Sequence, residues 1–214
     1  MKLYTYFRSS AAYRVRIALN LKGIAYEPAF VHLLKEGGQQ LQDAYRAVNP
    51  ERLVPCLQDG DATISQSLAI IEYLDETHPE VPLLPSDPLG RARVRSLAQM
   101  VACDIHPIDN LRVLRYLVNE LKVSEDAKNE WYRHWIREGF AALETRLARD
   151  AQTGRFCHGD TPGLADCVLV PQIFNARRLN VDMAPFPTIV RIDEACMALP
   201  AFQAAQPSQQ PDAE

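Results

Sequence analysis

The sequence predicts a mixed α/β region followed by an all-helical region. Strand and helix signals alternate over residues 1–80, and long helical patterns fill the rest of the chain. Between them, residues 79–88 (PEVPLLPSDP) contain four prolines and no periodic pattern, which is typical of a connector. We therefore predict an α/β plus all-α protein. Its first domain, 1–80, holds a four-stranded mixed sheet flanked by helices, and its second domain, 87–214, is a helical bundle.

The first domain opens with a strand–helix–strand unit. A short aromatic strand is predicted over Lys2–Phe7, and Ser10 is a suitable N-cap for a helix over Ala11–Lys22. Gly23 ends this helix in the usual C-terminal manner. A second strand follows over Tyr26–Val31. A unit of this length is normally parallel and right-handed.

The remainder of the first domain predicts a short helix, a hairpin and a longer helix. The short helix spans Leu41–Val48. Two short strands, Val54–Leu57 and Ala62–Ile64, flank Asp59-Gly60, which is a strong hairpin turn. A helix capped by Ser67 then runs to about residue 78. The predicted element order is βαβαββα.

The second domain shows only helical periodicity. Long amphipathic helices are predicted over Gly90–Leu121 and Glu125–Arg149, and shorter ones over Leu164–Leu179 and Thr188–Met197. The terminal segment Gln206–Glu214 (QPSQQPDAE) has the polar, proline-containing composition of a frayed tail.

Composition and charge exclude several function classes. The 214 residues are 47% hydrophobic and 23% charged, as in ordinary folded domains. With 23 Lys and Arg against 27 Asp and Glu, the chain lacks the basic excess that binding to nucleic acid requires. No stretch approaches the ~20 apolar residues of a membrane span. The N-terminus lacks the apolar core of a signal peptide, so we expect a cytoplasmic protein.

The cysteines do not form a site. There are five, and no two have the C-x-x-C spacing of zinc or dithiol redox motifs. They are Cys56, Cys103, Cys157, Cys167 and Cys196. We predict no metal centre and no disulfide framework. If a reactive sulfur takes part in the function, it belongs to a ligand.

A candidate site begins at Ser9-Ser10, where a strand opens directly into a helix. The N-terminus of a helix stabilises an anion such as a thiolate. A structural alternative is that the serines only cap the helix. Arg8 precedes them and can clamp a carboxylate, although an isolated arginine at a strand end is usually solvated.

Two further segments of the first domain add to this site. Val54-Pro55 enters an interior strand, where a proline is confined to the first position. A cis bond there would turn the backbone of Val54 toward a ligand, and an ordinary trans bond is the alternative. Gln66-Ser67 begins a second helix, with free amides for a carboxylate or simply a cap. Together these features predict a site for an extended, carboxylate-bearing, peptide-like ligand with an activatable group near the serine pair.

Four segments resemble the zeta class of glutathione transferases. They are Tyr6–Gly23 (YFRSSAAYRVRIALNLKG), Asn49–Pro55 (NPERLVP), Ile64–Leu74 (ISQSLAIIEYL) and Gly159–Gln172 (GDTPGLADCVLVPQ), followed by the ending Gln209–Asp212 (QQPD). The resemblance covers nearly the whole chain in order. It implies the glutathione transferase fold, with a thioredoxin-like N-terminal domain and an all-α C-terminal domain, usually in a homodimer.

The resemblance also implies roles for individual residues. Ser9, Ser10 and Arg8 would be catalytic. Besides the serine pair, the residues implied to hold glutathione are Ala11, Gln40, Val54, Pro55 in cis, Gln66, Ser67, His106 and Asn110. Arg8, Arg112 and Arg178 are the candidates to hold the carboxylates of the substrate; Arg178 is equally well explained as a solvated helix arginine.

The chain departs from the family pattern at two positions. Ala11 stands where the family motif has a cysteine, and because activation of glutathione is attributed to the serine, isomerase chemistry is expected to survive. Gly163 stands where a helix-capping box usually has Ser or Thr, while Asp166 is kept. We expect a weaker cap there and no loss of function.

The activity implied is a glutathione-dependent cis–trans isomerisation of maleylacetoacetate to fumarylacetoacetate in tyrosine and phenylalanine breakdown. Addition of a thiolate to the conjugated double bond leaves a single bond that can rotate, and elimination then gives the trans isomer. Isomerisation of maleylpyruvate in the gentisate route, transfer chemistry on α-halo acids, and a non-catalytic binding module remain as alternatives. A binding module has no need to keep the residues of a glutathione site, which speaks against it.

Overall fold

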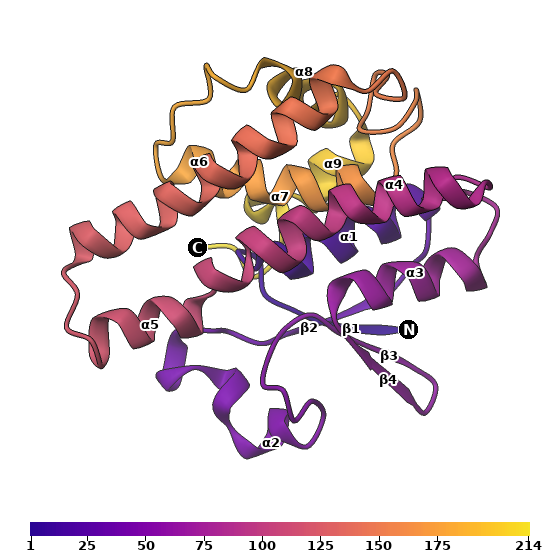
Figure 1. Ribbon diagram of the computed structural model, residues 1–214. Helices are drawn as coiled ribbons and strands as arrows, with labels where there is room; N and C mark the ends of the chain where they lie inside the picture. The colour runs from indigo at the N-terminus through magenta and orange to yellow at the C-terminus, as the bar shows by residue number, and fades with distance from the viewer. The chain divides into compact units, whose positions relative to one another are not determined.

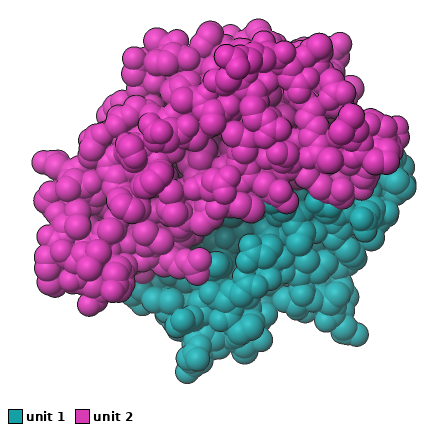
Figure 2. All heavy atoms as spheres, viewed as in Figure 1, with its two compact units in different colours: residues 1–83, 197–214 teal, residues 84–196 magenta.

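The computed structural model describes residues 1–214, which form two compact units. Unit 1 contains Met1–Leu83 and Met197–Glu214, and unit 2 contains Leu84–Cys196 (Figure 2). The boundary after Leu83 lies within the proline-rich connector. The sequence-based division grouped residues 197–214 with the helical domain, whereas by compactness they belong with the sheet. No helix of the chain combines the length and apolar character needed to cross a membrane.

A four-stranded mixed sheet forms the centre of unit 1. Its strands are β1 (Lys2–Thr5), β2 (Glu27–Phe30), β3 (Cys56–Asp59) and β4 (Ala62–Ser65), in the spatial order β2-β1-β3-β4. β1 pairs in parallel with β2 and antiparallel with β3, and β3 pairs antiparallel with β4. The predicted parallel unit and hairpin are therefore both confirmed. Gly60 supplies the positive φ of 56° that the hairpin turn requires.

The helices of unit 1 are α1 (Ser10–Lys22), α2 (Asp43–Arg46), α3 (Ser67–Thr77) and α9 (Pro200–Ala205). Single 3-10 turns occur at Lys35–Gly37, Gln39–Leu41 and Pro207–Gln209. α1 packs against α3 and also against α9, while α2 lies on the other side of the sheet (Figure 1). α9 lies outside the helices predicted from the sequence. It connects the end of the chain to α1.

Both helix starts in the predicted site lie one residue from where the sequence suggested. The N-cap of α1 is Ser9, whose Oγ accepts a hydrogen bond from the amide of Ala12 at 3.2 Å, so Ser10 is the first helical residue. The N-cap position of α3 is Gln66, which makes no side-chain cap. Ser67 is therefore the first residue of that helix, not its cap. Ser9 and Ser10 both carry the hydroxyl that an N-cap needs, so the sequence alone does not show which of the two caps α1.

Unit 2 is entirely helical, as predicted. Its helices are α4 (Pro88–Gln99), α5 (Leu111–Asn119), α6 (Glu125–Arg149), α7 (Leu164–Arg178) and α8 (Pro187–Met197), the last ending at the unit boundary. The bounds predicted for α6 are confirmed. Along α6 the apolar stripe is buried, at Tyr132, Ile136, Phe140, Leu143 and Leu147.

The single helix predicted over Gly90–Leu121 is wrong. After α4 the chain makes a π-helical turn over Met100–Ile105 and a 3-10 turn over Pro107–Asp109 before α5 begins. A proline has no N–H, and its ring clashes with the preceding turn, so Pro107 cannot sit inside a regular α-helix without a distortion. The break places His106 and Asn110 at helix ends.

α7 begins with half of a capping box. Gly163 has no side chain to accept from the helix, but the Asp166 carboxylate accepts from the amide of Gly163 at 2.8 Å. Its other oxygen accepts from the amide of Cys157 at 2.9 Å. The carboxylate therefore joins the loop before α7 to the first turn of the helix, and only the hydroxyl half of the cap is missing.

The expectation of a frayed tail is wrong. The Asp212 carboxylate accepts a hydrogen bond from the amide of Phe7 at 2.9 Å, and Glu214 pairs with Lys35. The first contact brings the tail onto the turn between β1 and α1, and the second brings its end onto the 3-10 turn Lys35–Gly37. Because the partners are far apart in the sequence, no local pattern could reveal them.

Candidate functional site

Ser9 lies at the N-terminus of α1 with a hydroxyl that can still donate. Its oxygen accepts from the amide of Ala12, and a hydroxyl carries one donor in addition to its acceptor lone pairs. The O–H therefore remains available to a ligand, and the helix N-terminus adds its partial positive charge there. Ser10 is only 8% exposed. Of the serine pair, Ser9 is the better placed to contact a ligand.

Arg8 lies between the β1 strand and Ser9, with an exposed side chain. Its guanidinium lies 5.6 Å from the ring centroid of Phe7. The Tyr6 phenol is nearby, and burial raises the pKa of Tyr6, an effect that the positive charge of Arg8 partly offsets. The phenol therefore stays protonated at neutral pH and places no negative charge beside Arg8.

A small buried cluster joins three of the predicted site segments. It consists of Tyr6, Phe7, Val31, Tyr45 and Val54, with Leu33 packed against it. Gln40 is attached to this cluster through its Nε2, which lies 3.5 Å from the carbonyl oxygen of Leu33. The cluster therefore brings the segments of Arg8 and Ser9, of Gln40 and of Val54 together.

Gln40 carries an orphaned acceptor. The residue is 6% exposed, and its Oε1 is buried with no hydrogen-bond partner in the protein. A buried acceptor left unpaired costs about 1–3 kcal/mol. A ligand N–H or ammonium group would remove that cost, so this oxygen points to a polar ligand.

The turn before β3 holds Val54 firmly. Tyr45 donates from its hydroxyl to the carbonyl oxygen of Leu53 at 2.6 Å, and Asn49 donates to the same oxygen at 2.9 Å. The Val54-Pro55 peptide bond is cis, as the family resemblance implied. β3 begins directly after Pro55, which therefore occupies the only place in the strand region where its missing N–H is harmless.

The start of α3 is strained and anchored. Gln66 has a φ of 69°, in a region that residues other than glycine rarely occupy and that recurs at binding sites. Glu51 accepts from Gln66 Nε2 at 2.7 Å and from Ser65 Oγ at 2.5 Å. The Ser67 hydroxyl accepts from Arg14 Nη1 at 3.1 Å, which ties α3 to α1. Sequence reasoning missed Glu51 and Arg14, although Glu51 lies inside the quoted segment NPERLVP.

Arg14 and Arg16 bury two positive charges in α1. The apolar pattern of this helix predicts a buried face of apolar residues, whereas the two arginines are buried as well. A guanidinium next to two helix N-termini adds to the positive potential there, and that potential favours a carboxylate or a thiolate.

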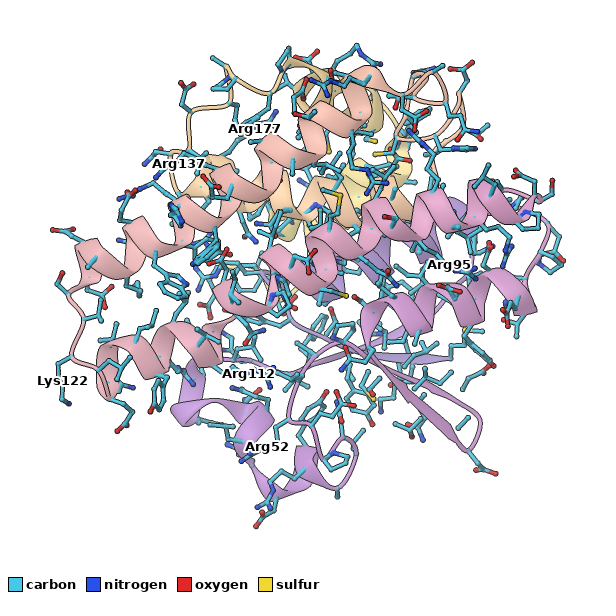
Figure 3. All side chains as sticks on the ribbon, viewed as in Figure 1. Arg52, Arg95, Arg112, Lys122, Arg137 and Arg177 are labelled. Atoms are coloured by element: carbon cyan, nitrogen blue, oxygen red, sulfur yellow. The ribbon has the colours of Figure 1, made fainter.

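Unit 2 carries the other four predicted residues. His106 ends the π-helical turn, and Asn110 caps α5 by accepting from the amide of Arg112 at 3.1 Å. Arg112 is exposed in the first turn of α5 (Figure 3). The break at Pro107 thus places His106 at the end of the π-helical turn and Asn110 and Arg112 at the start of α5. Arg178 lies on another helix, α7, exposed and 6.0 Å from the ring centroid of Tyr132.

The cysteines of the chain are all free, and only Cys103 is exposed. Burial raises the pKa of Cys56 to about 11 and also raises the pKa of Cys157 and Cys196. These three thiols therefore stay protonated at neutral pH and are poor nucleophiles. No group of three or more His, Cys, Asp or Glu side chains is arranged to hold a metal ion.

Known proteins match this chain along nearly its full length. The family model for the glutathione S-transferase N-terminal domain matches residues 3–82, and that for the C-terminal domain matches residues 126–204. A probable maleylacetoacetate isomerase of Vibrio cholerae is 51% identical over 211 residues, which are 99% of this chain and 97% of the relative.

Two solved structures share both the fold and much of the sequence. The holo structure of a bacterial maleylpyruvate isomerase of the zeta class is 52% identical, with a TM-score of 0.97 and full coverage of both chains. Maleylacetoacetate isomerase from Methylobacterium extorquens, solved with malonate and glutathione bound, is 46% identical, with a TM-score of 0.96 and the same coverage. The chain therefore belongs to the glutathione S-transferase family, as the resemblance to its zeta class predicted.

Proposed function

We propose that this protein is a glutathione-dependent cis–trans isomerase that converts maleylacetoacetate to fumarylacetoacetate. The observation that carries the proposal is Ser9, which caps α1 and keeps an O–H donor available where the helix terminus favours an anion. The relative from Vibrio cholerae, named for this reaction, supports the same activity.

The residues of unit 1 fit glutathione, which is a peptide-like ligand with two carboxylates and an ammonium group. The buried Oε1 of Gln40 lacks a donor that such a ligand provides. The start of α3 offers amides without acceptors inside the helix, which suit a carboxylate. We propose as glutathione contacts Ser9, Ser10, Ala11, Gln40, Val54, Pro55, Gln66, Ser67, His106 and Asn110.

Bound glutathione supplies a thiolate nucleophile that is regenerated at the end of each cycle. The Ser9 hydroxyl donates a hydrogen bond to that sulfur, and the N-terminus of α1 with the buried Arg14 lowers the pKa of the thiol. Ala11 contributes no competing thiol, so the motif cysteine is dispensable in this role. Arg8, Arg112 and Arg178 are proposed to bind the carboxylates of the diacid and to stabilise the negative charge that develops on its conjugated carbonyl.

Variants of Ser9 test the proposal. Wild-type protein with glutathione and maleylacetoacetate should form the fumaryl product, and protein without glutathione should not. Ser9→Gly removes the hydroxyl but costs a helix only a few tenths of a kcal/mol. We expect it to lose at least ~10²-fold in kcat/KM with little change in the thermal unfolding midpoint. If the thermal unfolding midpoint falls along with kcat/KM, Ser9 acts only as a helix cap. If the wild-type protein does not turn over maleylacetoacetate, the isomerase assignment is refuted.

Maleylpyruvate is the second candidate substrate, because the zeta-class maleylpyruvate isomerase is 52% identical over the full chain. Both substrates are cis diacids with the same reacting bond and different chain lengths. The ratio of kcat/KM values for the two diacids decides between them. A ratio favouring maleylpyruvate by tenfold or more would reassign the substrate while leaving the roles of Ser9 and Arg8 unchanged.

We also propose that the protein acts as a homodimer in the cytoplasm, in the breakdown of tyrosine and phenylalanine. Five free cysteines suit a reducing compartment. Light scattering on the purified protein measures the oligomeric state directly, and a mass near the 24.1 kDa of one chain would refute the dimer.

A further inference from the structure

The C-terminal tail, Gln206–Glu214, reaches the turn that carries the candidate serine. In this turn the amide of Ser9 donates to the carbonyl oxygen of Tyr6 at 3.0 Å, so Phe7 and Arg8 are its two central residues. The turn's own hydrogen bond does not use the amide of Phe7. That amide donates instead to the Asp212 carboxylate at 2.9 Å.

Arg16 holds the same stretch of backbone from the side of α1. It is fully buried, and its Nη2 donates to the carbonyl oxygen of Phe7 at 2.9 Å. Its Nη1 donates to the carbonyl oxygen of Tyr6 at 3.3 Å and to the Thr5 hydroxyl at 3.1 Å. Its Nε donates to the carbonyl oxygen of Ala205 at 3.1 Å, at the end of α9. Arg16 therefore fastens both the turn and the helix that leads into the tail.

Phe7 is thus bound on both of its backbone groups by ionisable side chains. Arg16 binds its carbonyl oxygen, and Asp212 binds its N–H. Burial lowers the pKa of Arg16 to about 10, and the negative charge of Asp212 acts in the opposite direction, so the guanidinium is charged at neutral pH. With both groups held, the orientation of Phe7 is set, and the position of Ser9 two residues later follows from it.

We propose that Asp212 is a positioning residue, which holds the Tyr6–Ser9 turn through the amide of Phe7 and so sets the place of the Ser9 hydroxyl. The inference rests on the proposed role of Ser9 toward glutathione. Without the carboxylate, the Phe7 amide loses its acceptor and the turn can shift while α1 stays in place. A shift of this kind weakens a short, directional hydrogen bond from Ser9 more than it weakens the fold.

The test uses the full-length protein with three tail variants. Asp212→Ala removes the acceptor, and Asp212→Asn keeps an acceptor oxygen without the charge. Glu214→Gln is the matched control, because it removes a carboxylate of the same tail whose ion-pair partners are Lys35 and His32 and not the backbone of the turn. Three quantities are measured: the Kd for glutathione by calorimetry, the apparent pKa of the bound thiol from its thiolate absorbance, and the thermal unfolding midpoint.

We expect Asp212→Ala to weaken glutathione binding by about fivefold, the value of one hydrogen bond, and to raise the apparent pKa of the bound thiol. Asp212→Asn and Glu214→Gln should stay within about twofold of the wild type. If Asp212→Ala does not fold, Asp212→Ser, whose side chain is shorter, replaces it with the same expectation.

Two outcomes would overturn the inference. If Asp212→Ala lowers the unfolding midpoint but keeps the wild-type Kd and thiol pKa, Asp212 only anchors the tail. If Asp212→Ala and Asp212→Asn weaken glutathione binding equally, the effect comes from the charge and not from the hydrogen bond. Failure of the underlying proposal has a different signature, because wild-type protein would then bind no glutathione, or Ser9→Gly would leave the thiol pKa unchanged.

Discussion

Replacing Asp109 by Asn is expected to stabilise the protein at neutral pH. Asp109 lies in the 3-10 turn before α5, is 3% exposed, and has no hydrogen-bond partner on either side-chain oxygen. Burial raises the pKa of this carboxyl from 3.8 to about 8. In the folded protein the group is therefore mostly protonated at pH 7, whereas in the unfolded chain it is ionised.

The magnitude follows from this difference in pKa. Between the unfolded and folded pKa values the folded state holds a proton that the unfolded state has lost, so stability falls as the pH rises from about 4 to about 8. Each pH unit in this window costs ~1.4 kcal/mol, and the cost reaches at most about 4 kcal/mol at pH 7. Asn is nearly isosteric with the protonated carboxyl and does not titrate, so Asp109→Asn removes this cost.

Urea unfolding of wild type and Asp109→Asn at several pH values between 4 and 8 measures the effect. The two proteins should be equally stable near pH 4, and the variant should be more stable by up to ~4 kcal/mol at pH 7. Asp104→Asn, an exposed carboxylate in the same segment, is the control for the change in net charge. A variant that is no more stable than the wild type at pH 7, or two parallel pH profiles, would refute the reasoning.

Three further substitutions probe unit 2. Asp166→Ala leaves the buried amide of Cys157 and the half-buried amide of Gly163 without an acceptor, and urea unfolding should show a loss of about 2–4 kcal/mol. A loss below ~1 kcal/mol would contradict the role of the carboxylate. Glu144→Ala removes the α6 carboxylate that accepts from two amides in the first turn of α8, and the same measurement should show about 1–2 kcal/mol, with Glu144→Gln recovering part of it. Arg112→Leu should raise the KM for the cis diacid about tenfold and leave the Kd for glutathione unchanged, and an unchanged KM would remove Arg112 from the proposed substrate contacts.

Much of the fold follows from short-range patterns. The ends of α6, the glycine that ends α1 and the two-residue hairpin between β3 and β4 all depend on residues within one or two turns of each other. Pro107 is also visible in the sequence as a helix breaker, but the prediction of one helix over Gly90–Leu121 rested on the amphipathic pattern alone. Ser9-Ser10 at a helix start was likewise readable locally, to within one residue.

The anchoring of the candidate site could not be read in this way. Glu51 precedes β3 and accepts a hydrogen bond from Gln66 at the start of α3, and Arg14 donates from α1 to Ser67. Gln40 has an acceptor without a partner because its side-chain oxygen is buried in the folded chain. Burial and pairing of polar groups depend on which segments meet in space. The helix and strand propensities of single residues carry no information about which segments meet.

The sequence by itself determined the order of strands and helices over residues 1–80 and a serine at the N-terminus of α1. Only the tertiary structure decided what holds that serine in place. The tail looks disordered by composition, because its polar residues cannot bury themselves against their own neighbours. It becomes ordered when Asp212 meets an amide 205 residues away, a backbone donor whose own turn leaves it unpaired. A contact over that separation is a property of the folded chain, since the packing of α9 against α1 and the bond from Arg16 to Ala205 place the tail beside the start of α1.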